Sequence, residues 1–340
     1  MKKTLTLSVL ALAASLGTSA AMAQTLNVVC SNEQAWCDLM AQNFEIETGI
    51  DVAVVRKSTG ETLAQIRAEA GNPKVDVWWG GTGDPHLIAA AEDLTQPSGV
   101  DVSGQLGWSQ NMTEMSGGKA VGVHVGLLGV IYNTEVLAEK GLEPPACWRD
   151  LAKPEYLGEI QVANPNSSGT AYTELATLVQ LFGEDEGFKL LAEIGRNVNQ
   201  YTKSGSAPGK ATARGENTIA IGFMHDMVNL KKQGFPVEIV APCEGTGYEV
   251  GSMSIVEGAP NPDEARVFYD WVLTPEAQNL MPEAGSYQIP SNKAATISDK
   301  VPDLSQIKLI DYDFAEYGSS ERRKGLLARW DAEIGGRAAE

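Results

Sequence analysis

The sequence is poor in positive charge. Only 26 of its 340 residues are Lys or Arg, against 44 Asp or Glu, and the formal net charge is -18. A chain with this balance repels a phosphate backbone at long range, so we expect no nucleic acid among its partners. Hydrophobic residues make up 43% and charged residues 21% of the chain. These fractions are typical of a soluble globular protein and argue against fibrous, disordered and polytopic membrane classes.

Long apolar runs are also missing, except near the N-terminus. A mostly apolar stretch covers residues 5–16, with Lys2 and Lys3 before it and the sequence Ala-Met-Ala ending at Ala23 after it. This order is typical of a secretory signal peptide. The stretch is too short to span a bilayer, which takes roughly 18 apolar residues. We therefore interpret residues 1–23 as a signal peptide cleaved near Ala23, and we predict a soluble product outside the cytoplasm.

Cysteine and histidine are scarce. The chain has four cysteines, Cys30, Cys37, Cys147 and Cys243, and an even number in an oxidising compartment indicates two disulfides. Three pairings are possible. The short loop favours Cys30 with Cys37, and we predict Cys147 with Cys243 as the second bond. A zinc site is the alternative, but there is no C-x-x-C spacing and only three histidines, so we predict no metal site.

Common catalytic signatures are absent as well. The sequence has no G-x-S-x-G elbow, H-E-x-x-H motif, Walker loop or Rossmann glycine fingerprint. A secreted hydrolase or transferase would need an activated nucleophile, and neither Ser204 nor Ser206 has a base evident in the sequence. Closure of two lobes around a small molecule requires no nucleophile. We therefore predict a binding protein rather than an enzyme, with no cofactor.

Short β-rich apolar runs alternate with longer helical patterns, which is typical of α/β folds with mostly parallel sheets. Strands are expected at 26–30, 50–55, 75–79, 159–163, 218–223 and 237–240, and helices at 33–48, 62–70, 85–91, 170–182, 185–194 and 263–272. Two longer extended stretches, 120–132 and 248–256, bracket the central block. We therefore predict that the chain leaves one lobe, builds a second and returns. Residues 24–124 and 252–340 would form lobe 1, and residues 125–251 lobe 2.

Four turns after predicted strands combine hydroxyl side chains with glycines where a helix should begin. They cover residues 58–61, 80–85, 164–170 and 202–208. The free N–H groups and the positive dipole end of a helix start favour an anion. Each turn alone is also explained as an ordinary helix cap. Because two facing lobes would bring several turns into one cleft, we predict an anion site made of Ser58, Thr59, Ser168, Gly169, Ser204 and Ser206.

A histidine and two carboxylates form a second group of candidates. His225 and Asp226 follow a predicted strand, whose carboxyl end would enter the same cleft, and Glu249 lies on the second extended stretch. Such groups can bind sugar hydroxyls, accept from an ammonium or ligate a metal. The alternative is a capping Asp226 and a packed His225. Of the adjacent Trp78 and Trp79, only one can face a cleft, and Trp79 is the candidate for stacking on a ligand ring.

The order and spacing of several short motifs resemble a known family, the periplasmic solute-binding proteins of ABC importers, in the branch for iron(III) and phosphorylated compounds. The motifs are LGVIYN at 128–133, WRDL at 148–151, KPEY at 153–156, NPNSSG at 164–169, GAPNP at 258–262 and TPEAQ at 274–278. The resemblance covers essentially the whole mature chain. It implies a periplasmic, type II fold of two α/β lobes that close like a Venus flytrap, an ABC permease in the inner membrane as partner, and a monomeric receptor.

The resemblance also bears on the ligand. Ferric-binding members typically carry an adjacent tyrosine pair near the end of the strand that here precedes His225, whereas Tyr201 and Tyr248 of this chain are isolated. The hydroxyl-rich run 202–206, together with His225, Asp226 and Glu249, is instead similar to hexose-phosphate-binding members. There the turns hold the phosphate, and the acidic and imidazole groups hold sugar hydroxyls. A sugar phosphate is therefore the expected ligand, followed by an aminoalkylphosphonate and then a ferric ion, with a secreted enzyme last.

Overall fold

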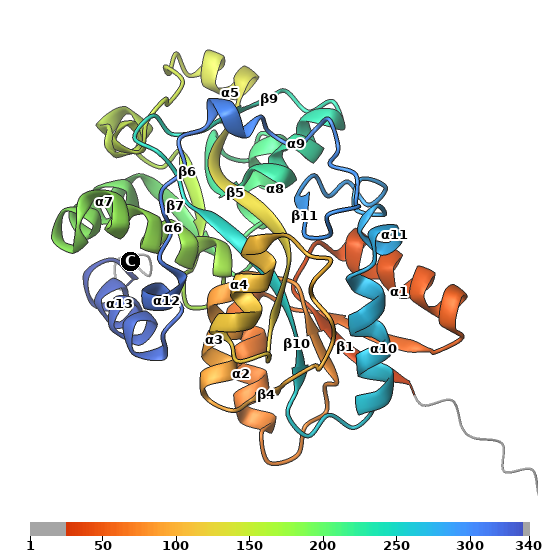
Figure 1. The fold of residues 1–340 in the computed structure, drawn as a ribbon. Helices are drawn as coiled ribbons and strands as arrows, with labels where there is room; N and C mark the ends of the chain where they lie inside the picture. The colour runs from red at the N-terminus through yellow and green to blue at the C-terminus, as the bar shows by residue number, and fades with distance from the viewer. Residues whose placement is uncertain (1–24, 336–340) are drawn as a thin grey trace, which may run out of the picture.

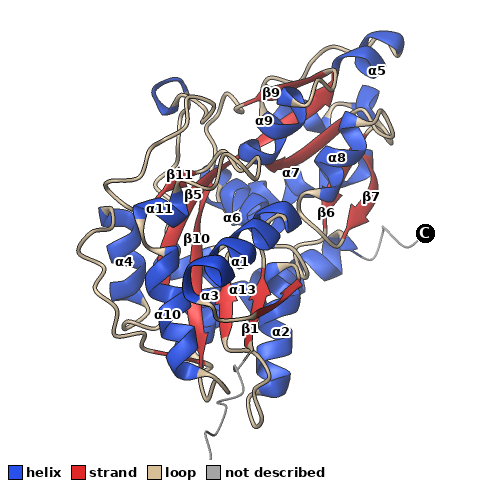
Figure 2. Cartoon of the chain, turned by 90° about the vertical axis from the view of Figure 1, so that its right-hand side faces the viewer, coloured by secondary structure: helices blue, strands red, loops and turns tan. Residues whose placement is uncertain are grey.

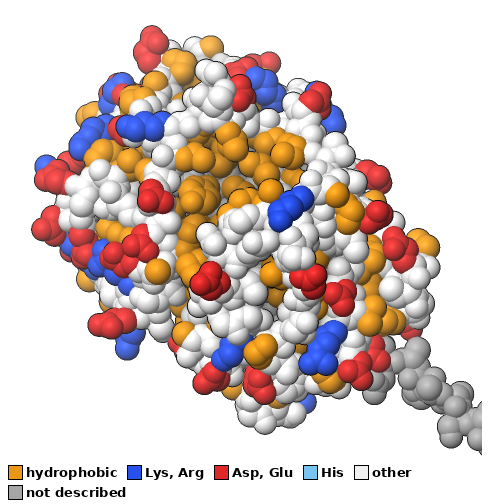
Figure 3. All heavy atoms as spheres, viewed as in Figure 1, with side chains coloured by type: hydrophobic (Ala, Val, Ile, Leu, Met, Phe, Trp, Pro, Cys, Tyr) orange, Lys and Arg blue, Asp and Glu red, His pale blue; other side chains and the backbone are white. Residues whose placement is uncertain are grey.

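The computed structural model describes residues 25–335, so the predicted signal peptide lies outside the described residues. Two α/β lobes make up this part of the chain, stacked one above the other in Figure 1. Within residues 25–335 no helix is long and apolar enough to cross a lipid bilayer. On the face seen in Figure 3, acidic and basic side chains are scattered around the surface and do not form a patch of one sign.

The sheet of the first lobe begins with three parallel strands. Strand β1 (Leu26–Cys30) pairs with β2 (Val52–Arg56) and with β3 (Val77–Trp79). The connections that parallel strands require are α1 (Gln34–Thr48) and α2 (Thr59–Glu69). The strands lie where the sequence predicts them, and α2 begins three residues before the prediction of 62 because Ser58 caps it. The other elements on this side are α3 (Gly83–Ala91), β4 (Thr95–Gln96), α4 (Gly107–Met115), α10 (Pro262–Val272), α11 (Pro275–Gln278) and β11 (Ile289–Pro290).

The second lobe repeats this plan around a second sheet. Strand β6 (Ile160–Ala163) pairs in parallel with β7 (Val198–Thr202) and with β8 (Ile219–Phe223). Its core lies between the sheet and two long helices, α6 (Gly169–Phe182) and α7 (Glu184–Asn197). The remaining elements are α5 (Thr134–Glu139), α8 (Ala207–Ala213), α9 (Met224–Lys232), β9 (Val237–Val240), and the 3-10 helices at Trp148–Ala152 and Pro154–Tyr156. Each lobe therefore contains the parallel βα units expected of an α/β protein.

Two long strands connect the lobes, β5 (Val121–Asn133) and β10 (Tyr248–Val256), at the stretches predicted to be extended. They run antiparallel to each other through the middle of the molecule (Figure 2). The first half of β5 pairs with β10, and its second half pairs antiparallel with β8 and β9. The pairing with β10 has a bulge between Gly251 and Ser252. Because β5 belongs to both sheets, the site between the lobes lies beside these two strands.

The C-terminal segment packs on the second lobe. Helices α12 (Phe314–Tyr317) and α13 (Ser320–Glu333) lie beside α6 and α7 in Figure 1. Leu326 and Trp330 of α13 are buried in the same core as Phe188 of α7. The prediction that all of 252–340 belongs to lobe 1 needs correction here, since α13 finds its apolar contacts in the other lobe. We propose that residues from about 312 to 335 belong with lobe 2, and we leave the other predicted boundaries unchanged.

Both disulfides join the cysteines that the sequence pairs. Cys30, at the end of β1, is bonded to Cys37 on α1. Cys147 is bonded to Cys243 across a sequence separation of 96 residues, and both cysteines lie within the second lobe. All four cysteines are used in these bonds, so none of them is available as a thiolate ligand for the zinc site considered as the alternative.

Candidate functional site

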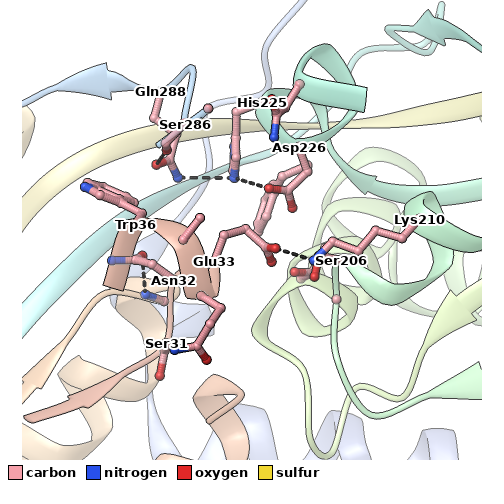
Figure 4. A pocket seen from close by; sticks show the side chains of 18 of the residues that line it. Ser31, Asn32, Glu33, Trp36, Ser206, Lys210, His225, Asp226, Ser286 and Gln288 are labelled. Carbon is pink, nitrogen blue, oxygen red and sulfur yellow. Dashed lines mark hydrogen bonds and ion pairs between the residues drawn. The ribbon is translucent and has the colours of Figure 1, made fainter. Parts of the chain in front are cut away.

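A cavity of about 470 Å³ lies between the two lobes, lined by loops and helix ends from both. Figure 4 shows its wall from close by, with Ser31, Asn32 and Glu33 of the first lobe on one side and Ser206 and Lys210 of the second on the other. The volume falls within the range of about 300–1,000 Å³ that small-molecule sites occupy. It is far larger than a single metal ion or a bare phosphate requires.

At one end of the cavity, three of the predicted anion-binding turns meet at the N-termini of α2, α6 and α3. Ser58, Thr82 and Ser168 are the residues that precede these helices. These three turns lie so close together that a glycine in one of them has no space for a side chain. A Cβ atom on Gly169 would collide with the Thr82 hydroxyl and lie 2.9 Å from Oγ1 of Thr59. The structure therefore brings the turns of both lobes together, and we name this part of the cavity, lined by Ser58, Thr59, Thr82, Ser168, Gly169, Gly205 and Ser206, the anion end.

Thr82 of the anion end was not named among the predicted site residues, although its turn was. Its side chain is 1% exposed, it lines the cavity, and its hydroxyl has no hydrogen-bond partner within residues 25–335. A buried hydroxyl left without a partner costs roughly 1–3 kcal/mol. An oxygen of a bound ligand would supply the missing partner.

Three cations of the cavity wall, Arg56, Lys210 and Arg214, were missed by sequence reasoning, because an isolated Arg or Lys carries no motif. Arg56, at the end of β2, donates from Nη2 to Oγ of Ser204 at 3.2 Å. Lys210 on α8 forms an ion pair with Glu33 across the cleft (Figure 4). Ser204 is not part of the cavity wall itself, since its hydroxyl is engaged with Arg56 and lies 3.3 Å from Oγ of Ser206. The predicted direct contact of Ser204 with the ligand is therefore not supported by its position, and we propose that it holds Arg56 and Ser206 in place.

At the other end of the cavity, the three predicted polar residues lie together. His225 and Asp226 begin α9 directly after β8, and Nε2 of His225 lies 3.5 Å from Oδ1 of Asp226. Gln288 reaches the same place from the C-terminal return of the chain. Its Nε2 donates to Oε1 of Glu249 at 3.1 Å and lies 3.3 Å from Nε2 of His225 (Figure 4). We call these four residues the polar end.

Burial controls the charges of the polar end. It lowers the pKa of His225 to about 4, so the imidazole is neutral at physiological pH. Burial, together with the nearby carboxylates of Glu33 and Glu249, raises the pKa of Asp226 well above its ordinary value. Burial alone would also raise the pKa of Glu33, but Lys210, Ser206 and Arg56 together outweigh it and the pKa is lowered. A neutral imidazole and a carboxyl that tends to keep its proton can both donate to and accept from hydroxyl groups.

Comparison with known proteins places these features in a family. The sequence profile of bacterial extracellular solute-binding proteins matches residues 92–317. The chain belongs to this family. A curated protein of Haemophilus influenzae is 43% identical over 312 residues, which cover 91% of this chain and 90% of that protein. The matched family confirms the predicted solute-binding receptor, and the structure has the two lobes that the sequence predicts.

Two solved structures of solute-binding proteins resemble this one over nearly their whole length. The periplasmic binding protein AfuA from Actinobacillus pleuropneumoniae, with fructose-6-phosphate bound, is 42% identical with a TM-score of 0.89, covering 92% of this chain and 98% of that chain. The periplasmic binding protein P5PA is 37% identical with a TM-score of 0.87, covering 91% of this chain and 99% of that chain. Both are named as binding proteins, in line with the absence of catalytic motifs from this sequence.

The stacking role predicted for Trp79 is wrong for this solute-binding protein. Trp79 is 1% exposed and does not line the cavity; its ring packs edge-on against Trp36 at 5.2 Å. Trp78 stacks on His86 at the opposite face of β3. Because helices cover both faces of this sheet, neither tryptophan reaches the cleft. The aromatic side chains in the cavity wall are Trp36, on α1, and Phe223 and Phe235 of the second lobe.

Proposed function

We propose that the protein is the periplasmic receptor of an ABC importer and that it captures a sugar phosphate between its lobes. The phosphate would lie at the anion end, against the backbone N–H groups of Thr59 and Gly169 and the hydroxyls of Thr82 and Ser206. The sugar would lie at the polar end, where His225, Asp226 and Glu249 offer donors and acceptors to its hydroxyls. The observation that carries this proposal is that one cavity joins three helix N-termini to a buried set of acidic and imidazole groups.

The two ends together favour a phosphate ester over its simpler alternatives. A neutral sugar would leave the helix N-termini and the Thr82 hydroxyl without an anion. A bare phosphate would leave most of the 470 Å³ empty and would leave the donors and acceptors of the polar end without a partner. A ferric ion prefers hard oxygen ligands such as phenolate, and no tyrosine belongs to this cavity wall. A molecule with an anion at one end and hydroxyl groups at the other satisfies both ends.

An aminoalkylphosphonate is the second candidate, because its ammonium could pair with the carboxylates of the polar end. Burial works against this candidate, since the raised pKa of Asp226 favours its neutral form, which suits a hydroxyl better than a cation. The resemblance of the fold to a binding protein with bound fructose-6-phosphate points in the same direction. We further propose that the receptor is a monomer, is cleaved near Ala23, delivers its ligand to an inner-membrane permease and carries out no chemistry on it.

A thermal-shift screen tests the proposal. The mature protein is heated with fructose 6-phosphate, fructose, inorganic phosphate, 2-aminoethylphosphonate or ferric citrate, each at the same concentration. A ligand at one hundred times its Kd adds about 2.7 kcal/mol of stability, so the true class should separate clearly from the rest. We expect the largest shift with fructose 6-phosphate. A shift with 2-aminoethylphosphonate alone would favour the second candidate, and no shift with any phosphorylated compound would overturn the proposal.

A further inference from the structure

Gln288 is the residue of the polar end that belongs to no predicted element or motif. It is 5% exposed and immediately precedes β11, whose residue Ile289 pairs with Val125 of β5. The neighbouring residue of β5, Gly126, pairs with Glu249 of β10. A Cβ atom on Gly126 would come within 2.8 Å of Oε1 of Glu249. The strand pairing thus places Gln288 next to the position where Gly126, which lacks a side chain, leaves room for the Glu249 carboxylate and the His225 ring.

The surroundings of Gln288 decide how its amide group is oriented. Oε1 of Gln288 accepts from the Ser286 hydroxyl at 2.7 Å. Its Nε2 faces Oε1 of Glu249 at 3.1 Å and Nε2 of His225 at 3.3 Å. Because Oε1 already accepts from Ser286, the NH₂ group is the half of the amide that faces Glu249 and donates to it. Its two hydrogens then match its two neighbours, Glu249 and His225.

This orientation has a consequence for the proton of His225. A neutral imidazole has one nitrogen that donates and one that accepts. Nδ1 of His225 has no hydrogen-bond partner within the described part of the chain, so the choice is made at Nε2. There the ring nitrogen lies between the amide of Gln288 and Oδ1 of Asp226, which is 3.5 Å away. If Nε2 of His225 carried the proton, its N–H would face the N–H of the Gln288 amide, and two donors would meet. If Nε2 carries the lone pair instead, it accepts a hydrogen bond from the Gln288 amide.

The other titratable groups near Glu249, His225 and Asp226 do not make the hydrogen bonds that Gln288 makes. Nε2 of His124 lies 3.7 Å from Oε1 of Glu249, beyond hydrogen-bond distance. Glu33 is held by Lys210 on the far side of Asp226 (Figure 4). Gln288 is therefore the neutral side chain that joins Glu249 to the imidazole, and through it to Asp226.

We propose that Gln288 is a positioning residue of the binding site: its amide holds His225 as the Nδ1–H tautomer and fixes the Glu249 carboxylate. His225 then does not donate to Asp226, and the Asp226 oxygens stay available for hydroxyl groups of a ligand. The benefit to ligand binding rests on the function proposed above. The tautomer of His225, in contrast, is a property of the ligand-free protein and can be measured without any ligand.

The first experiment is ¹⁵N NMR of the imidazole nitrogens in the mature, ligand-free protein. Only three histidines are present, and the His225→Gln variant assigns the signal of interest. We expect the proton on Nδ1 in the parent and, at a pH at which Asp226 is ionised and can accept, a transfer to Nε2 in Gln288→Leu. The matched control is Gln278→Leu, because Gln278 is a buried glutamine that is likewise hydrogen-bonded to a serine, here as donor to Ser291, but does not line the cavity. It should leave the tautomer unchanged. If Gln288→Leu does not fold, Ser286→Ala loosens the same amide and should shift the tautomer in part.

The second experiment measures the Kd of fructose 6-phosphate by calorimetry. Gln288→Leu should weaken binding about tenfold, the usual scale for one buried hydrogen bond to a charged group, while Gln278→Leu should change it less than about twofold. A proton found on Nε2 in the parent, or a tautomer that Gln288→Leu and Ser286→Ala leave unchanged, would overturn the positioning role whatever the ligand is. If the tautomer responds as expected but fructose 6-phosphate does not bind the parent, the positioning role is supported and the proposed ligand is wrong.

Discussion

The two ends of the cavity are built from different materials. The anion end is made of backbone N–H groups and small side chains, each contributed by a turn that directly follows a strand. The polar end is made of long side chains from three segments far apart in the sequence, at His225 and Asp226, at Glu249 and at Gln288. Backbone groups stay in place when one side chain is lost, whereas side-chain groups do not. Different substitutions should therefore weaken ligand binding at the two ends.

The ends also differ in how their charges are balanced. At the anion end, Arg56 and Lys210 lie beside Glu33, so cations and a carboxylate offset one another. At the polar end, Asp226 and Glu249 directly contact neutral side chains, His225 and Gln288, while Lys210 is paired with Glu33. A carboxyl group buried without a cation loses more from removal of a partner than an exposed ion pair does. Ligand groups at the polar end should therefore contribute more selectivity per contact.

The largest effect is expected from a change in backbone packing at the anion end. In Gly169→Ala, the added methyl group would meet both γ atoms of Thr82, so no rotation of that side chain relieves the clash. The turns of the two lobes would be forced apart. We expect the affinity for fructose 6-phosphate to fall more than about 100-fold, since several N–H groups would lose their position around the phosphate together. Gly325→Ala on α13 is the matched control, because no atom lies within 4 Å of its Cβ position. Parent-like binding by Gly169→Ala in calorimetry would remove the anion end from the site.

A smaller effect is expected from loss of a side chain at the polar end, and a smaller one still at the anion end. Asp226→Ala should cost about 2 kcal/mol of binding free energy, or roughly thirtyfold in Kd, because it leaves buried ligand hydroxyls without a partner. Ser206→Ala should cost less than about fivefold, since backbone N–H groups still hold the anion. Asp51→Ala, at the opposite end of β2, is the control for loss of an exposed carboxylate. Equal losses for Asp226→Ala and Ser206→Ala would contradict the contrast between the two ends.

The same contrast explains what could be predicted from the sequence. Parallel strands end at one edge of a sheet, so the turns after β2, β3 and β6 were expected to meet, and their serines and glycines were recognisable one turn at a time. His225, Asp226 and Glu249 were found because they also sit at strand ends or on a connecting strand. The alternation of βα units likewise predicted the fold and most strand positions to within a few residues.

The features that were missed depend on pairing between distant segments. The position of Gln288 is set by the register in which the two-residue strand β11 pairs with β5. That register cannot be predicted from the local sequence. Trp79 was assigned to the cleft because alternation alone does not tell which face of a strand a helix will cover. The packing of α13 on the second lobe was missed because the apolar residues of a helix indicate that one face is buried but not which lobe buries it.

A buried acid outside the cavity gives the last test, with the smallest expected effect on binding. Glu174 lies on α6, five residues after Gly169, in an apolar space beside Leu175, Tyr201 and Trp330. Burial raises its pKa to about 8, from 4.5. The folded protein therefore holds a proton here that the unfolded chain releases above about pH 4.5. The contribution to stability is fully present below that pH and is lost as the pH rises toward 8.

Glu174→Gln keeps the shape of the side chain but cannot ionise. We expect the variant to gain stability over the parent as the pH rises from 5 to 8, on the order of 3 kcal/mol at the upper end, in urea unfolding measured at both pH values. Glu139→Gln, an exposed position on α5, should show no such gain. A difference between Glu174→Gln and the parent that is the same at pH 5 and pH 8 would contradict the raised pKa. The Kd of fructose 6-phosphate should be unchanged in Glu174→Gln, because Glu174 does not line the cavity that we propose as the ligand site.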